Sequence, residues 1–139
     1  MENRFYSILK IAEVKENDAA RGYVRAREVW EFNQSKLDEL RAFRAEYHQE
    51  DAVSVSPQQF QSTRNFLSQL SVAIDNQEAE VARHQQHMGS EEGEWLSTRV
   101  KRKSIETLSE KRTAAAEEKR DKQEQLEMDE LSRRERPQF

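Results

Sequence analysis

The sequence predicts an all-α protein: a long antiparallel two-helix coiled-coil hairpin with a C-terminal helical overhang. Charged residues make up 36% of its 139 residues and apolar residues 35%, which suits long helices with a narrow apolar face better than a thick core. Three glycines and two prolines leave few places for turns. The apolar residues recur in alternating steps of four and three, the spacing of a coiled-coil seam.

The first helix is expected over about residues 3–49. Its seam is apolar except at Glu16, Asn33 and Arg44, and a repeat kept over this length is a strong coiled-coil signal. The predicted seam positions are Phe5, Leu9, Ala12, Glu16, Ala19, Tyr23, Ala26, Trp30, Asn33, Leu37, Leu40, Arg44 and Tyr47.

A second helix start lies in the middle of the chain. Ser56 is a predicted N-cap, Pro57 suits the first helical position, and Gln59 completes a capping box. Val55 before the cap is expected to pack on Phe60 as a hydrophobic staple. These signals predict a turn over about residues 50–55 and a second helix over about 56–134, within one coiled-coil domain that covers residues 1–139.

The second helix keeps the same spacing. Its predicted seam positions are Phe60, Thr63, Leu67, Leu70, Ile74, Gln77, Val81, His84, Met88, Glu91, Trp95, Thr98, Arg102 and Ile105. Folding the chain back at the turn is expected to pair residues whose numbers sum to about 107, because small seam residues then face large ones. This register places Tyr47 against Phe60, Tyr23 against His84, Ala12 against Trp95 and Glu16 against Glu91. Beyond Ile105 the second helix has no predicted partner.

Several function classes are disfavoured by composition. A net charge of −4 makes nucleic acid a poor partner, and no stretch is apolar enough for direct membrane insertion. The chain has no cysteine nucleophile and no glycine-rich phosphate loop, so no enzyme activity and no cofactor are expected. The basic run from Arg99 to Lys103 is interpreted as a solvated helix face, with an acidic protein partner as the alternative.

Two histidines on the second helix are candidate metal ligands. His84 and His87 share a helical face with Glu80 and Glu91, and this set could in principle hold a metal ion. Such a site also needs ligands from a neighbouring helix, and the register offers Tyr23 opposite His84. The preferred interpretation is one seam histidine beside an exposed one, so no metal site is predicted.

The two rows that flank the seam differ in character. One row carries Ile8, Val29, Phe43, Phe66 and Ala73. The opposite row is polar and consists of Glu13, Arg27, Gln34, Arg41, Arg64 and Glu78. Near the turn, the two phenylalanines join Leu40, Tyr47 and Leu70 in an apolar patch that two helices cover only in part, which is typical of a protein-binding surface. The alternative is that the two phenylalanines simply cover each other.

Several short motifs, in this order and spacing, resemble the flagellar export protein FliJ family almost from end to end. The matching residues are Asp18-Ala19-Ala20-Arg21, Phe43-Arg44-Ala45-Glu46-Tyr47, residues 66–74 (FLSQLSVAI), Trp95 before the Lys/Arg run, Thr113-Ala114-Ala115-Ala116 and Met128-Asp129-Glu130-Leu131.

The resemblance implies a non-enzymatic cytoplasmic component of the bacterial flagellar type III export apparatus, peripherally associated with the inner membrane. It implies a coiled coil similar to the central stalk of rotary ATPases, a monomer when free. Its implied partners are the export ATPase hexamer, the cytoplasmic domain of the membrane export gate and export chaperones. The family surface for the gate maps to Leu40, Phe43, Tyr47, Phe66, Leu70 and Ala73.

Two other hypotheses stay open at this point. One is the stalk component of a virulence type III secretion system, which shares the fold and differs in its partners. The other is a structural coiled coil that associates with itself through the apolar flank and the overhang, which scattering and mass measurements would detect as a concentration-dependent oligomer.

Overall fold

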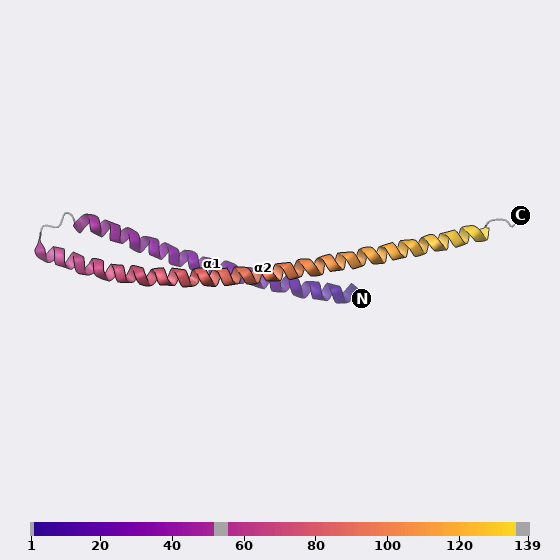
Figure 1. The fold of residues 1–139 in the computed structure, drawn as a ribbon, viewed down its shortest axis with the longest axis horizontal. Helices are drawn as coiled ribbons and strands as arrows, with labels where there is room; N and C mark the ends of the chain where they lie inside the picture. Colours follow the sequence, from indigo (N-terminus) through magenta and orange to yellow (C-terminus); the bar gives the residue numbers. More distant parts are fainter. Residues whose placement is uncertain (1, 52–55, 136–139) are drawn as a thin grey trace. The chain divides into compact units, whose positions relative to one another are not determined.

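The computed structural model describes residues 2–51 and 56–135 and consists, over these ranges, of two helices. Helix α1 spans Glu2–Asp51 and helix α2 spans Pro57–Glu135 (Figure 1). The described residues form no strand, and the two helices pack against each other in antiparallel order. The predicted all-α hairpin is therefore confirmed.

Helix α2 begins at the predicted N-cap. The Ser56 carbonyl accepts a hydrogen bond from the Phe60 amide at 2.9 Å, and the Ser56 Oγ accepts one from the Gln59 amide at 3.4 Å. The first of these is the first hydrogen bond of the helix itself, and the second lets the Ser56 hydroxyl satisfy one of the otherwise free N–H groups at the helix start. The other half of the predicted staple, Val55, lies outside the described residues.

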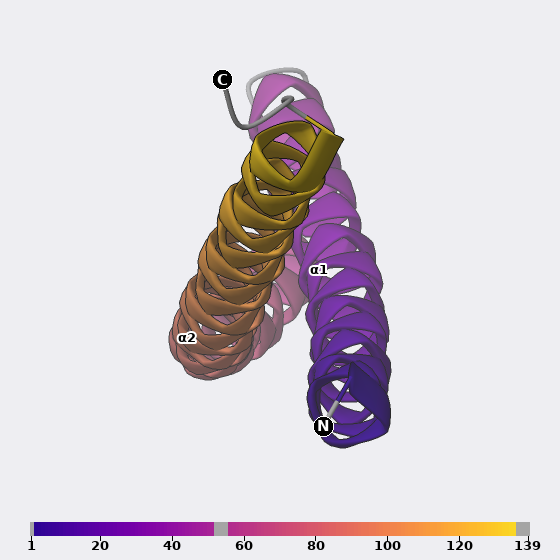
Figure 2. The same cartoon turned by 90° about the vertical axis from the view of Figure 1, so that its right-hand side faces the viewer.

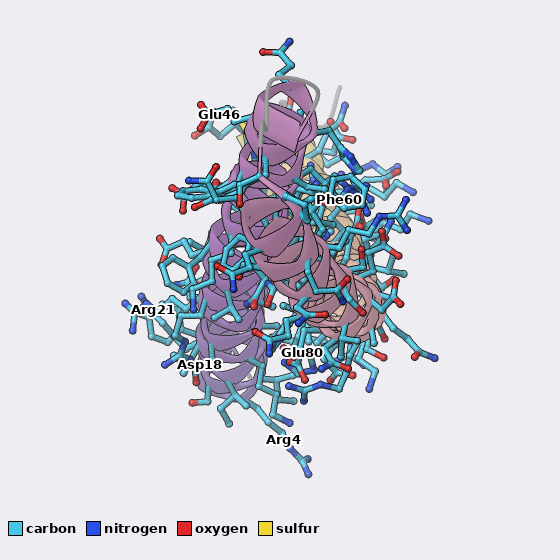
Figure 3. The ribbon with its side chains drawn as sticks, turned by 90° about the vertical axis from the view of Figure 1, so that its left-hand side faces the viewer. Arg4, Asp18, Arg21, Glu46, Phe60 and Glu80 are labelled. Carbon is cyan, nitrogen blue, oxygen red and sulfur yellow. The ribbon has the colours of Figure 1, made fainter. Side chains whose placement is uncertain are left out.

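Phe60 itself is not a seam residue, contrary to the prediction. Its side chain is 42% exposed, and its ring lies under the guanidinium of Arg64, with the Arg64 Cζ atom 5.2 Å from the ring centroid. Figure 3 shows Phe60 on the opposite side of the helix pair from Glu46. The last aromatic residue of the α1 seam, Tyr47, contacts Phe66 instead, which leaves Phe60 without a place between the helices.

The chain divides into two compact units, each built from part of α1 and part of α2. We call Asn17–Ser97 the hairpin unit, and Met1–Glu16 with Thr98–Phe139 the terminal unit. The prediction that residues 1–139 form one domain stays a prediction.

The hairpin unit holds the aliphatic core. Leu37, Leu70, Ile74 and Val81 form a buried cluster in which Ile74 is only 1% exposed. Two partly buried seam residues, Trp30 and Leu40, pack against this cluster. Ala26 and Leu67 are also buried, and every one of these residues occupies a predicted seam position. The seam read from the spacing is thus confirmed here.

The register of the two helices differs from the predicted one. The Gln77 side-chain amide donates to the Asn33 carbonyl at 2.9 Å and to Asn33 Oδ1 at 3.0 Å, whereas the predicted register places Gln77 opposite Trp30. Trp95 stacks on Tyr23, with ring centroids 5.5 Å apart, whereas the predicted register places Trp95 against Ala12. In both pairs the α1 residue lies closer to the turn than predicted.

Two physical effects explain the shift. Helical side chains lean toward the amino end of their helix, so in an antiparallel pair a long side chain reaches past the residue at its own level. The shifted register also gives the half-buried Gln77 amide two acceptors on Asn33, which a register chosen by side-chain volume alone ignores.

The terminal unit is held together differently. Ala12 is its one buried apolar residue among those described. Arg102 donates from Nε to Glu16 at 2.7 Å, from Nη2 to Glu16 at 3.4 Å, and from Nη1 to Glu106 at 2.6 Å. We call these three residues the arginine clamp. Near the amino end of α1, the Arg112 Cζ atom lies 4.7 Å from the centroid of the Phe5 ring.

The arginine clamp corrects one expectation and confirms another. Glu16 pairs with Arg102, so the predicted contact between Glu16 and Glu91 is wrong. Arg102 occupies its predicted seam position with a side chain only 21% exposed, whereas its neighbours Arg99, Lys101 and Lys103 in the basic run are exposed, as expected for a solvated face. The hydrogen bonds from Arg102 lower the pKa of Glu16, and those from Arg102 to both carboxylates raise the pKa of Arg102.

Beyond Arg112, helix α2 continues as a helix whose side chains are all exposed to Glu135. Figure 1 shows this yellow end of α2 continuing past the amino end of α1 with no second helix alongside, and Figure 2 shows the two helices viewed from the side of these ends. Leu126, Met128 and Leu131 are 57–70% exposed. The predicted helical overhang is therefore present.

Candidate protein-binding surface

The six residues predicted to bind a partner all lie in the hairpin unit, but they fall into two groups. Leu70 is buried and Leu40 packs against the core cluster, so both mainly support the hairpin. Phe43, Phe66 and Ala73 are exposed, and Tyr47 is half-buried.

Three of these residues form an aromatic cluster, which we define as Phe43, Tyr47 and Phe66. The Tyr47 and Phe66 ring centroids are 4.5 Å apart, with the rings tilted by 36°. The Phe43 and Tyr47 rings stack with centroids 6.1 Å apart. Tyr47 therefore contacts both phenylalanines and holds the rings of the two helices together.

The aromatic cluster remains open to solvent. Phe43 is 52% exposed and Phe66 is 39% exposed, so the contacts with Tyr47 do not cover them. This decides against the alternative in which the two phenylalanines bury each other. Single aromatic side chains elsewhere, such as Phe32 at 61%, are equally exposed, but these three rings contact one another across both helices, and a contiguous exposed apolar patch is typical of a binding surface.

On the opposite flank, charged side chains form ion pairs with one another. Arg41 and Glu78 form an ion pair between the helices at 3.1 Å, and Arg27 pairs with Glu31 at 3.1 Å along α1. The polar row predicted from the sequence contains Arg27, Arg41 and Glu78, but the Arg41–Glu78 pair was not predicted because it depends on the true register. The apolar and polar flanks of the hairpin unit thus differ as predicted.

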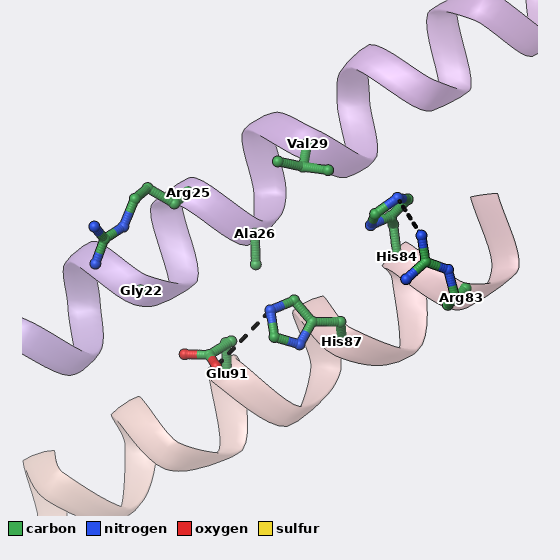
Figure 4. A pocket seen from close by; sticks show the side chains of 8 residues that line it. All are labelled: Gly22, Arg25, Ala26, Val29, Arg83, His84, His87 and Glu91. Atoms are coloured by element: carbon green, nitrogen blue, oxygen red, sulfur yellow. Dashed lines mark hydrogen bonds and ion pairs between the residues drawn. The ribbon is translucent and has the colours of Figure 1, made fainter. Parts of the chain in front are cut away.

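A groove lies between the helices of the hairpin unit, with a volume of about 690 Å³. Its α1 wall consists of Gly22, Arg25, Ala26 and Val29. Its α2 wall consists of Arg83, His84, His87 and Glu91 (Figure 4). Val29 belongs to the same apolar row as Phe43, so the groove and the aromatic cluster occupy the same flank.

The two histidines in this groove are engaged by acidic side chains of their own helix. His84 Nε2 lies 3.4 Å from a Glu80 oxygen, and His87 Nε2 lies 3.9 Å from a Glu91 oxygen. Glu80 also accepts a 2.7 Å hydrogen bond from Arg83, which lowers the pKa of this carboxyl group. Within residues 2–51 and 56–135, no group of three His, Asp or Glu side chains is arranged to hold a metal ion.

The hairpin unit presents surfaces on both of its flanks. Tyr23, which the predicted register placed opposite His84, stacks on Trp95 instead. Neither described helix is long and apolar enough to cross a membrane. What the hairpin unit presents to a partner is an exposed aromatic cluster and, further along the same flank, a groove lined by arginines and histidines.

Comparison with known proteins identifies the family. A sequence model described as "Flagellar FliJ protein" matches residues 1–136, nearly the whole chain. A comparison with curated proteins finds no match. The family consists of non-catalytic components of the flagellar type III export apparatus. With its seam, its helix start and the family match over residues 1–136, the chain belongs to the flagellar FliJ protein family.

Proposed function

We propose that this chain links the export ATPase ring to the cytoplasmic domain of the membrane export gate. In this proposal, Leu40, Phe43, Tyr47, Phe66, Leu70 and Ala73 form the surface that binds the gate. The observation that carries the proposal is the exposed aromatic cluster, because a free monomer gains nothing from leaving such rings in water.

The structure supports a division of labour among these six residues. Leu70 belongs to the buried core and Leu40 packs against that core, so these two hold the hairpin together, while Phe43 and Phe66 offer the area that a partner can cover. Aromatic residues dominate binding energies because they bury much surface at little cost in conformational entropy.

The terminal unit supports the second half of the proposal. Its α2 segment is an exposed helix that, like the central stalk of a rotary ATPase, suits insertion into the ring of the export ATPase. The protein is then a monomer when free, acts in the cytoplasm at the inner membrane, and also engages export chaperones. Its localisation at the membrane results from binding to the gate.

The gate-binding surface is tested by measuring the affinity of the purified gate cytoplasmic domain for variants of this chain. Phe43→Ala and Phe66→Ala should each weaken binding roughly five- to thirtyfold, the range for an aromatic anchor. Leu70→Ala is less informative because Leu70 is a core residue.

The matched control is Phe60→Ala. Phe60 is 42% exposed in α2, close to the value for Phe66, and lies under the guanidinium of Arg64, a residue of the polar row, outside the aromatic cluster. Its removal should leave both the affinity and the helix content unchanged. Wild-type affinity in Phe43→Ala and Phe66→Ala, with normal circular dichroism, would remove this surface from the proposal.

A further inference from the structure

The groove in the hairpin unit already contains a carboxylate. Gly22 lacks a side chain, and the Glu91 carboxylate lies over it: a Cβ atom built on Gly22 would stand 2.7 Å from Glu91 Oε2. The other Glu91 oxygen lies 3.9 Å from His87 Nε2 (Figure 4). The notch at Gly22 and the neighbouring imidazole therefore accommodate an acidic side chain.

The rest of the groove is suited to negative charge as well. Each helix contributes one arginine to the walls, Arg25 from α1 and Arg83 from α2. Arg83 is paired with Glu80, but Arg25 has no ion-pair partner in the described part of the chain. Two apolar residues of α1 also line the groove, the buried Ala26 and the 44% exposed Val29. An acidic residue flanked by apolar ones matches this lining.

The groove continues the flank that carries the aromatic cluster. Gly22, Val29 and Phe43 lie at multiples of seven residues along α1, which places them on one edge of the helix pair. At ~1.5 Å per residue, Gly22 and Phe43 are roughly 30 Å apart along the helix axis. A third helix of about twenty residues laid along this flank covers both features.

We infer that the flank receives an amphipathic helix of the protein that binds the aromatic cluster. Apolar residues at one end of this helix cover Phe43 and Phe66, and acidic residues at its other end enter the groove beside Arg25 and His87. The incoming carboxylate takes the place of Glu91, which acts as an internal substitute until the partner arrives. This inference rests on the proposed function, because it assigns a second contact to the same partner.

The test compares two charge reversals only two residues apart. Arg25→Glu changes the groove, while Arg27→Glu makes the same change on the opposite flank, where Arg27 is paired only with Glu31. Both residues are exposed, so both variants should keep wild-type helix content. Binding of the purified gate cytoplasmic domain is measured at low and at high salt concentration.

The expected result is specific to the groove. Arg25→Glu should weaken binding roughly three- to tenfold at low salt and less at high salt, since exposed charge pairs contribute modestly and are screened. Arg27→Glu should bind as the wild type does. Glu91→Gln should bind more tightly than the wild type, because the charge that competes with the incoming carboxylate is gone.

The outcomes separate this inference from the proposal on which it rests. If Phe66→Ala weakens binding while Arg25→Glu and Glu91→Gln bind as the wild type does, the groove contact is wrong and the gate-binding surface stands. Equal loss in Arg25→Glu and Arg27→Glu would show a general charge effect and would also overturn the groove contact. If Phe43→Ala and Phe66→Ala bind normally, the gate-binding surface itself fails.

Discussion

The hairpin unit and the terminal unit share the same seam spacing but are held together by different forces. In the hairpin unit the seam is aliphatic, and Leu37, Leu70, Ile74 and Val81 form a buried cluster. In the terminal unit, over its described residues, only Ala12 is a buried apolar side chain, and the arginine clamp takes the central place. The spacing of residues along a helix thus determines which side chains meet in the seam. The chemistry of those side chains determines how strongly the two helices are held together.

This difference predicts different sensitivities. Apolar burial stabilises by roughly 25 cal/mol per Å² and depends little on salt. Ion pairs near the surface contribute less and weaken with salt and with protonation of their carboxylates. The hairpin unit should therefore keep its structure under conditions in which the two segments of the terminal unit separate.

The largest effect is expected at the centre of the hairpin unit. Ile74 is the most buried large side chain, at 1% exposure. Ile74→Ala should lower the free energy of unfolding by about 2–4 kcal/mol, because it removes buried methyl groups and leaves a cavity. The measurement is chemical denaturation followed by circular dichroism.

The matched control for this prediction lies in the terminal unit. Ile11 has the same side chain but is 56% exposed, so Ile11→Ala should cost less than about 0.5 kcal/mol. Similar losses in the two variants would show that the cost at Ile74 does not come from its burial, and would contradict apolar burial as the force that holds the hairpin unit together.

A smaller effect is expected where the hairpin unit contains its polar seam pair. Gln77→Leu removes both hydrogen bonds to Asn33 and leaves the Asn33 Oδ1 atom without its donor, at an expected cost of roughly 1 kcal/mol. The double variant with Asn33→Leu should recover part of this loss, since two apolar residues can replace a hydrogen-bonded pair. Additive losses in the double variant would show that the two side chains do not act together.

The most local effect is expected from the arginine clamp. Arg102→Leu leaves Glu16 without its partner, so amide hydrogen exchange should speed up in the terminal unit and stay unchanged in the hairpin unit. Lys101→Leu, which alters an exposed neighbour, is the control and should match the wild type. Faster exchange throughout the chain would contradict separate stabilisation of the two units.

The same clamp gives a pH dependence with a defined sign. The pKa of Glu16 is lowered in the folded protein, so its pairing stabilises the terminal unit above the ordinary carboxyl value of 4.5. This stabilisation is lost as the pH falls through the lowered pKa. The difference in exchange between the wild type and Arg102→Leu should therefore be full at neutral pH and disappear in acid.

Much of the fold could be predicted because one periodicity governs it. The seam positions from Phe5 to Tyr47 are all buried or half-buried, and the Ser56 cap starts α2 as predicted. The register could not be predicted from side-chain volumes. It depends on a few polar contacts over the seam, such as Gln77 with Asn33, and on the direction in which long side chains lean.

The candidate site was predictable in outline only. The row of Phe43, Phe66 and Ala73 follows from spacing alone. That Leu40 and Leu70 serve the buried core, and that Tyr47 contacts both phenylalanines, depends on the register. The notch at Gly22 carries no sequence signal of its own, because it exists only where the Glu91 side chain meets α1.

The helix start at Ser56 also gives the chain an order of assembly. Contacts between the helices link residues 37 positions apart at Arg41 and Glu78, 44 apart at Asn33 and Gln77, and 86 apart at Glu16 and Arg102. Closing a longer loop costs more entropy, so we expect the pairs nearest the turn to form first and each pair to shorten the loop that the next one closes. The hairpin is then expected to close from Ser56 outward, with the first helix unpaired during synthesis until the second has been made.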